Sequence, residues 1–90
     1  MTAAAILLSG LKIDLGFRSD AYDDRLTVYL EQAQAQITEE GISLSSSVQD
    51  NQLTIMYAAY LWRRRDSGEG MPRMLRYALN NRLFMEKMHG

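Results

Sequence analysis

The chain contains no cysteine, and its 90 residues include a single proline and a single histidine. Without cysteine there is no disulfide framework and no thiolate metal site. The histidine, His89, lies next to the last residue, where chains are commonly poorly ordered, so we expect no catalytic or ligand role for it. A chain of this length buries only roughly 60 to 65% of its unfolded surface, and association between copies is a common source of additional stability.

Long apolar runs are missing as well. The longest, Ala3–Leu8 and Ile55–Trp62, fall well short of the ~18 residues that a membrane span requires. The opening MTAAAILLSGLK lacks the basic start and the cleavage site of a secretory signal. We therefore expect a protein that is made and kept inside a cell and has no membrane partner.

The composition is that of an ordinary globular protein, with 47% hydrophobic and 23% charged residues, but the charges are unevenly distributed. Residues 1–50 carry three basic and eight acidic side chains, a net charge of −5, whereas residues 51–90 carry seven basic and three acidic ones, a net charge of +4. Such a division suits nucleic-acid binding, or contact between the acidic side of one subunit and the basic side of the next. It is equally compatible with two solvated surfaces that bind nothing.

Apolar residues recur at helical spacing over four segments, at about 3–15, 20–40, 48–66 and 72–88. Short polar or glycine-containing connections separate them. The chain has no alternation typical of strands, no internal repeat and no heptad series. We predict one all-α domain, residues 1–90, built as a small bundle of four helices joined by short loops.

Residues suited to helix ends support these boundaries. Ser19 or Asp20 is placed to cap the second helix, and Ser47 and Asp50 have the spacing of a capping box at the start of the third. Pro72 suits the first position of the fourth helix, where its missing N–H has no cost. Glycines that favour the left-handed conformation of a helix end follow the first three helices: Gly16, Gly41 and Gly68.

The third helix is the most apolar of the four. Almost every residue from Leu53 to Trp62 is apolar, which predicts a helix surrounded by its neighbours. Tyr57, Tyr60 and Trp62 project from different sides of this helix, so we expect that they cannot all point inward. Two roles remain open for them, packing in the core or at its boundary, and contact of at least one ring with a partner subunit.

Patterns that indicate catalysis or cofactor binding are absent from the sequence. Asp20, Asp23 and Asp24 lack the spacing of a calcium loop and suit the first turn of a helix instead. The serines of segment 45–47 have no histidine to activate them. The turn at 68–70 lacks the lysine and the length of a phosphate-binding loop. We therefore expect a protein that is not an enzyme and that binds neither a cofactor nor a metal ion.

The basic residues gather near the end of the third helix and in the fourth. Arg63, Arg64 and Arg65 are consecutive and project about 100° apart, so they form no flat patch by themselves, although Arg73 and Arg76 can join them across the turn. The net charge is only −1, and no helix carries the pattern of polar residues that reads DNA bases. Both features argue against a DNA-reading protein.

The order of the segments resembles a known family. The chain has an opening LKIDLG element, an acidic segment AYDDRLTVYLEQAQAQITEEG, and a final part DNQLTIMYAAYLWRRRDSGEGMPRMLRYALNNRLF with a Gly-Met-Pro turn. The order and spacing of these segments resemble those of the head-tail connector (adaptor) proteins of long-tailed double-stranded DNA phages and prophages. The resemblance covers nearly the whole chain.

The resemblance implies a structural virion protein, made in the cytoplasm of a bacterial host and located at the head–tail interface. It implies a ring of about twelve copies that docks below the portal and extends the DNA channel toward the tail. The implied partners are other copies, the portal protein, the next tail (stopper) component, and phage DNA that passes without sequence recognition. The C-terminal residues Arg82–Gly90 are implied to contact the portal and to become ordered on docking.

Charged residues are the candidates for the interface between subunits, for the portal contact or for the channel lining. Neighbouring copies in a ring present two different, complementary patches, which the uneven charge distribution can supply. The candidate residues are Arg63, Arg64, Arg65, Arg73, Arg76, Arg82, Lys87, Asp20, Asp23 and Asp24.

Two other functions remain open at the level of the sequence. A small helical DNA-binding regulator would use a turn-linked pair of helices and would bind DNA tightly and sequence-selectively at physiological salt. A generic protein-interaction module would bind a partner other than a portal protein.

Overall fold

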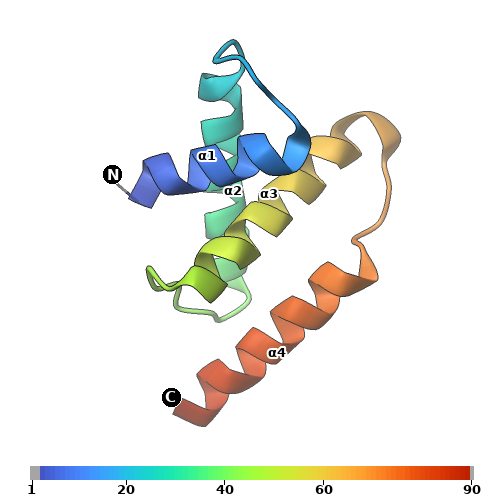
Figure 1. The fold of residues 1–90 in the computed structure, drawn as a ribbon. Helices are drawn as coiled ribbons and strands as arrows, with labels where there is room; N and C mark the ends of the chain where they lie inside the picture. Colours follow the sequence, from blue (N-terminus) through green and yellow to red (C-terminus); the bar gives the residue numbers. More distant parts are fainter. Residues whose placement is uncertain (1–2, 90) are drawn as a thin grey trace.

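The computed structural model describes residues 3–89, which form four α-helices joined by short loops (Figure 1). Helix α1 spans Ala3–Leu15, α2 spans Asp23–Glu39, α3 spans Val48–Ser67 and α4 spans Arg73–His89. The described residues contain no strand, so the predicted all-α fold with four helices is confirmed. None of these helices combines the length and the apolar character needed to cross a membrane.

The predicted helix boundaries agree with the structure to within three residues, and the largest difference is at the start of α2. The predicted cap by Ser19 or Asp20 is wrong: Tyr22 precedes the helix, and its side chain makes no capping hydrogen bond. The carboxylate of Asp20 instead accepts a hydrogen bond from the Lys12 ammonium at 2.7 Å. An ammonium is a stronger partner for a carboxylate than a neutral backbone amide is, so Asp20 faces α1.

The start of α3 follows the predicted cap in part. The Asp50 amide donates to Ser47 Oγ at 3.1 Å, as a capping box requires. The Asp50 carboxylate does not return to the Ser47 amide; it accepts hydrogen bonds from the amide and the hydroxyl of Ser45, at 2.8 and 2.9 Å. The loop before α3 is thereby fastened to the first turn of the helix.

The end of α3 is a left-handed glycine, as predicted. Gly68 has φ 67° and its amide donates to the Arg64 carbonyl at 2.9 Å. A side chain with a Cβ adopts this conformation only with strain, so glycine is the residue that permits the reversal into the α3–α4 connection.

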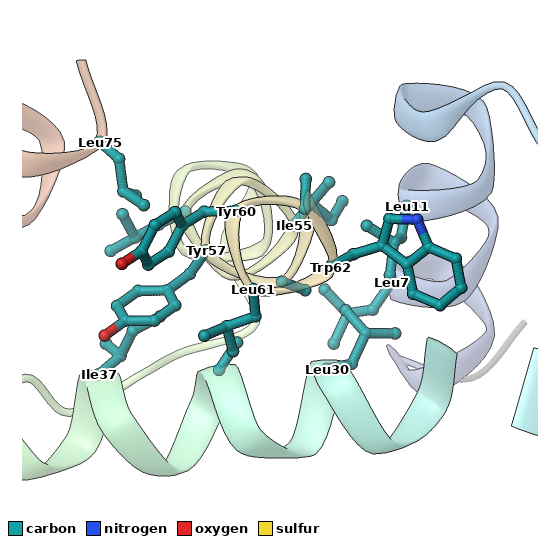
Figure 2. Packing of buried hydrophobic residues seen from close by; sticks show 14 of the residues in the cluster. Leu7, Leu11, Leu30, Ile37, Ile55, Tyr57, Tyr60, Leu61, Trp62 and Leu75 are labelled. Atoms are coloured by element: carbon teal, nitrogen blue, oxygen red, sulfur yellow. The ribbon is translucent and has the colours of Figure 1, made fainter. Parts of the chain in front are cut away.

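Helix α3 is the centre of the fold. Figure 2 looks along it and shows residues of α1, α2 and α4 around it. Ten of its residues are buried, which confirms the expectation of a helix surrounded by neighbours. The largest fully buried side chains of the core are Leu11, Leu26, Ile37, Ile42, Leu75 and Leu79.

The expectation that Tyr57, Tyr60 and Trp62 cannot all point inward is wrong, because all three are buried in the single chain. Helices α1, α2 and α4 surround α3 on three sides, so side chains on different faces of α3 are all buried (Figure 2). The Tyr57 hydroxyl donates to the side chain of Gln36 in α2 at 2.8 Å. The Trp62 ring lies edge-on to Phe17, with ring centroids 5.4 Å apart.

Helices α1 and α3 approach each other closely at Gly10. A Cβ at this position would lie 2.5 Å from Cδ1 of Ile55. Glycine inside a helix costs about 1 kcal/mol relative to alanine. At this position glycine allows α1 to lie directly against α3. The close packing of the two helices explains why α1 contains a residue that weakens a helix.

Candidate interaction surface

Helix α4 is attached to the rest of the molecule along one side, where it packs against α3 (Figure 1). Leu75 and Leu79 are buried in this contact, and Leu83 is half-buried beside them. Near its C-terminal end α4 is also held by a polar network. The opposite side of α4 has no cover from the described residues.

The polar network is centred on Arg82. Its guanidinium donates to both carboxylate oxygens of Asp50, from Nε at 2.8 Å and from Nη2 at 3.2 Å. It also donates from Nη1 to Glu86 at 2.7 Å and from Nη2 to the Ser43 carbonyl at 2.8 Å. These bonds tie α4 to the first turn of α3 and to the loop before it.

The electrostatics of this network favour the charged forms of its members. Asp50 is 3% exposed, and the hydrogen bonds from Arg82, followed by those from Ser45, hold the pKa of its carboxyl below the ordinary value. Hydrogen bonds from Arg82 and Ser43 likewise lower the pKa of Glu86, and the two carboxylates raise the pKa of Arg82. Arg82, a candidate for the portal contact or the channel, thus has its donors engaged within the chain.

The three consecutive arginines at the end of α3 also contact their own chain. Arg63 lies 3.6 Å from Asp14, and Arg64 donates to the Tyr60 hydroxyl at 3.0 Å. The Arg65 guanidinium stacks over the Trp62 ring, 3.7 Å from its centroid. The three side chains have separate partners, in agreement with the prediction that they form no single flat patch.

The acidic candidates divide into two groups. Asp20 and Asp23 lie 2.7 and 3.0 Å from the Lys12 ammonium and join α1 to the start of α2. Asp24 is exposed and has no ion-pair partner among residues 3–89. The described residues contain no group of three or more histidine, cysteine, aspartate or glutamate side chains placed to hold a metal ion.

Three of the four basic candidates on α4 follow one strip of the helix, Arg73, Arg76 and Lys87, whereas Arg82 lies on the side that faces α3. Arg76 pairs at 3.3 Å with Glu40, the residue that follows α2. Arg73 and Lys87 are exposed, and neither has an ion-pair partner within the part of the chain that the structure describes. Arg73 and Lys87 are therefore the candidate cations whose charges are available to a partner.

A stripe of large apolar side chains lies next to these cations, on the uncovered side of α4. At 100° per residue its members fall within an arc of about 100° on the helix. We call them the α4 stripe: Met74 (72% exposed), Tyr77 (58%), Phe84 (64%), Met85 (54%) and Met88 (68%).

The α4 stripe was not singled out from the sequence, because helical spacing of apolar residues does not tell which of them are covered by a neighbouring helix. Among the residues of α4 with a described side chain, only Leu75 and Leu79 are buried. The sequence does contain a sign of this stripe. Apolar residues lie on two separate sides of this helix, and Arg73, Arg76 and Lys87 lie on another, so a single neighbouring helix cannot cover both apolar sides.

A groove of about 690 Å³ runs between α3 and α4 and opens beside the α4 stripe. Its apolar lining includes Leu53 and Met56 of α3 and Ala78 and Met85 of α4, and its polar lining includes Arg82. Since Met85 belongs to both, the groove and the stripe are one continuous surface.

Comparison of the chain with protein-family models, with curated proteins and with solved structures finds no match.

Proposed function

We propose that this chain is a non-enzymatic structural protein, a head-tail connector subunit that forms a ring below the portal of a phage capsid. The observation that carries the proposal is the α4 stripe, a large apolar surface on a chain whose core is otherwise complete. Exposed apolar patches of this kind mark contact with other proteins. The order of the sequence segments, which resembles that of connector proteins, supplies the identity of the assembly.

The size of the stripe supports a permanent contact. Five large side chains that are each more than half exposed present on the order of 600 Å² of surface, at about 200 Å² per side chain. A specific interface buries about 800 Å² per partner, and its centre is apolar. Most of one side of such an interface is therefore available on α4 alone.

The network around Asp50 supports a structural role rather than a catalytic one. Asp50 is a buried carboxylate with a lowered pKa, a combination that active sites also use. Its two oxygens are both engaged by Arg82, and one also accepts from Ser45. A carboxylate with these partners fastens helices, and it has no oxygen directed at a substrate.

In such a ring the passing DNA meets a wall that does not read its sequence. Arg73 and Lys87 would offer charge to phosphates or to a neighbouring subunit, and neither use selects a base. Any affinity of the free chain for DNA should therefore be weak, independent of sequence, and reduced by salt.

The proposal is tested by deleting the gene for this chain from the phage or prophage that carries it and viewing the lysate by electron microscopy. A connector predicts DNA-filled heads and free tails that have not joined, with joining restored by the chain supplied from a plasmid. Normal tailed particles would contradict the proposal. A DNA-binding regulator would change transcript levels instead, and a purified regulator would bind one DNA sequence tightly at physiological salt.

A further inference from the structure

The uncovered side of α4 has a charged edge. Arg73 and Lys87 lie along the same side of the α4 stripe, next to Tyr77 and Phe84 on the helix. The two cations are 14 residues apart, which is about 21 Å at 1.5 Å per residue. The uncovered side of α4 therefore consists of the α4 stripe and, along one edge of it, a positive charge near each end of the helix, Arg73 and Lys87.

The outer side of α2 has the opposite character. Val28, which is 50% exposed, and Ala35, also exposed, lie one above the other at a spacing of seven residues. Asp24, Glu31 and Glu39 lie on the same side of the helix, within an arc of about 80° that includes Val28 and Ala35. All three acids are exposed and have no ion-pair partner among residues 3–89.

The two faces match in length and in charge. Asp24 and Glu39 are 15 residues apart, about 22 Å along α2, close to the 21 Å between Arg73 and Lys87. The unpaired acids of α2 thus correspond in spacing to the unpaired cations of α4. The acids lie beside the small apolar side chains of Val28 and Ala35, and the cations lie beside the large side chains of the α4 stripe. Opposite charges in this arrangement fix the register of a contact and suppress wrong partners.

We infer that the outer side of α4 in one copy of this chain docks on the outer side of α2 in the next copy. The inference rests on the proposed ring and names the surfaces that build it. Helices α2 and α4 lie on different sides of α3 (Figure 2), so both contacts can be made by one subunit at the same time. Two different patches per subunit are what a closed ring needs.

Pairing of α4 with α4 is less favourable. Two copies of α4 packed antiparallel about a two-fold axis would bring their basic edges together, and like charges at an interface are costly. The acids on α2 would remain without partners in that arrangement. Docking on α2 covers the α4 stripe and pairs the charges of both faces.

Charge reversal tests this inference. One variant carries Arg73→Glu and Lys87→Glu, and a second carries Asp24→Lys and Glu39→Lys. Each variant alone should associate at least about tenfold more weakly than the wild type, because its two faces then have the same sign. Mixing the two variants, or combining all four substitutions in one chain, should restore association. Association is measured by sedimentation equilibrium at low salt over a wide concentration range.

Two controls accompany the variants. Arg18→Glu reverses an exposed arginine that has no ion pair among the described residues and lies outside both faces, and it should leave association unchanged. Urea unfolding of every variant shows whether the fold is intact.

Several results would overturn the inference. One is a wild-type chain that stays monomeric over the whole concentration range. Another is a charge-reversed variant that associates as strongly as the wild type. A third is a pair of weakened variants whose association is not restored by mixing. If the α4 variant lost association while the α2 variant kept it, the acids of α2 would take no part in the contact, and this would also overturn the inference. The joining of heads to tails in the deletion experiment is a separate readout. A failure of the surfaces named here is thus distinguishable from a failure of the proposed function.

Discussion

Arg82 and Asp50 are 32 positions apart in the chain, and their side chains form a two-point ion pair between α4 and the start of α3. Nε lies 2.8 Å from Oδ1 and Nη2 lies 3.2 Å from Oδ2. Asp50 is 3% exposed and Arg82 is 21% exposed, so the pair is largely shielded from water. Since α4 packs on one side only, this pair and the leucines beside it decide where the helix lies.

Arg82→Ala should lower the free energy of unfolding by about 3 kcal/mol, because it leaves the buried carboxylate of Asp50 without its cation. The value is at the lower end for buried pairs, since a fifth of Arg82 is exposed. Urea unfolding followed by the fluorescence of Trp62, the only tryptophan, measures the change. Arg73→Ala is the matched control and should change stability by less than about 0.5 kcal/mol. Equal effects of the two substitutions would contradict the role given to Arg82.

Stability should decrease in acid partly because of Asp50. Its pKa in the folded protein is below the ordinary value of 3.8, mainly through the hydrogen bonds from Arg82. The resulting stabilisation is present in full above the ordinary pKa and is lost as the pH falls through the lower folded-state pKa. Asp50→Asn removes this titration, so its free energy of unfolding should fall less steeply below about pH 5 than that of the wild type. Urea unfolding at a series of pH values measures both slopes, and identical slopes would rule the contribution out.

Gly68→Ala should destabilise the protein by about 1 kcal/mol, because alanine is strained in the left-handed conformation that Gly68 adopts. Gly70→Ala is the matched control. Gly70 lies in the same connection, has no positive φ, and has open space where a Cβ would be added. Thermal unfolding should therefore separate the two variants. A Gly70 variant that is the less stable of the pair would show that the turn differs from the one described.

Arg64→Glu and Arg73→Glu should separate folding from assembly. Arg64 donates to the Tyr60 hydroxyl and lies over its ring, so its replacement should reduce stability. Arg73 has no such contact among the described residues, so its replacement should leave stability unchanged and weaken association. Circular dichroism melts and sedimentation velocity on the same samples measure the two properties. Full association with Arg73→Glu would remove this residue from the proposed interface.

The helices could be predicted from the sequence because their signals are local. Apolar spacing, the Ser47 cap and Gly68 each act within a few residues, and the structure confirms all three. The misplaced cap of α2 shows the limit of local reasoning. Asp20 satisfies the local rule for a cap, but Lys12 of α1 competes for its carboxylate, and the arrangement of α1 beside α2 is a tertiary property.

The candidate site was predictable only in part, because its parts are set by how the helices pack. The sequence singled out Arg82 as a candidate contact residue, and Asp50 as a cap, but nothing in either pattern pairs two residues 32 positions apart. The spacing of Arg82 and Glu86 on one helix was the only local sign of the network. The three aromatic residues of α3 were placed wrongly for the same reason, since their burial depends on neighbours on three sides.

The proposed connector must assemble at a portal. Electron microscopy of the purified portal from the same genome, with and without this chain, tests whether it does. We predict that the chain adds a second ring beneath the portal, with the same symmetry axis, and that Arg73→Glu combined with Lys87→Glu prevents closure of that ring. A portal that is unchanged after incubation, with the chain left in solution as a monomer, would contradict the proposed function.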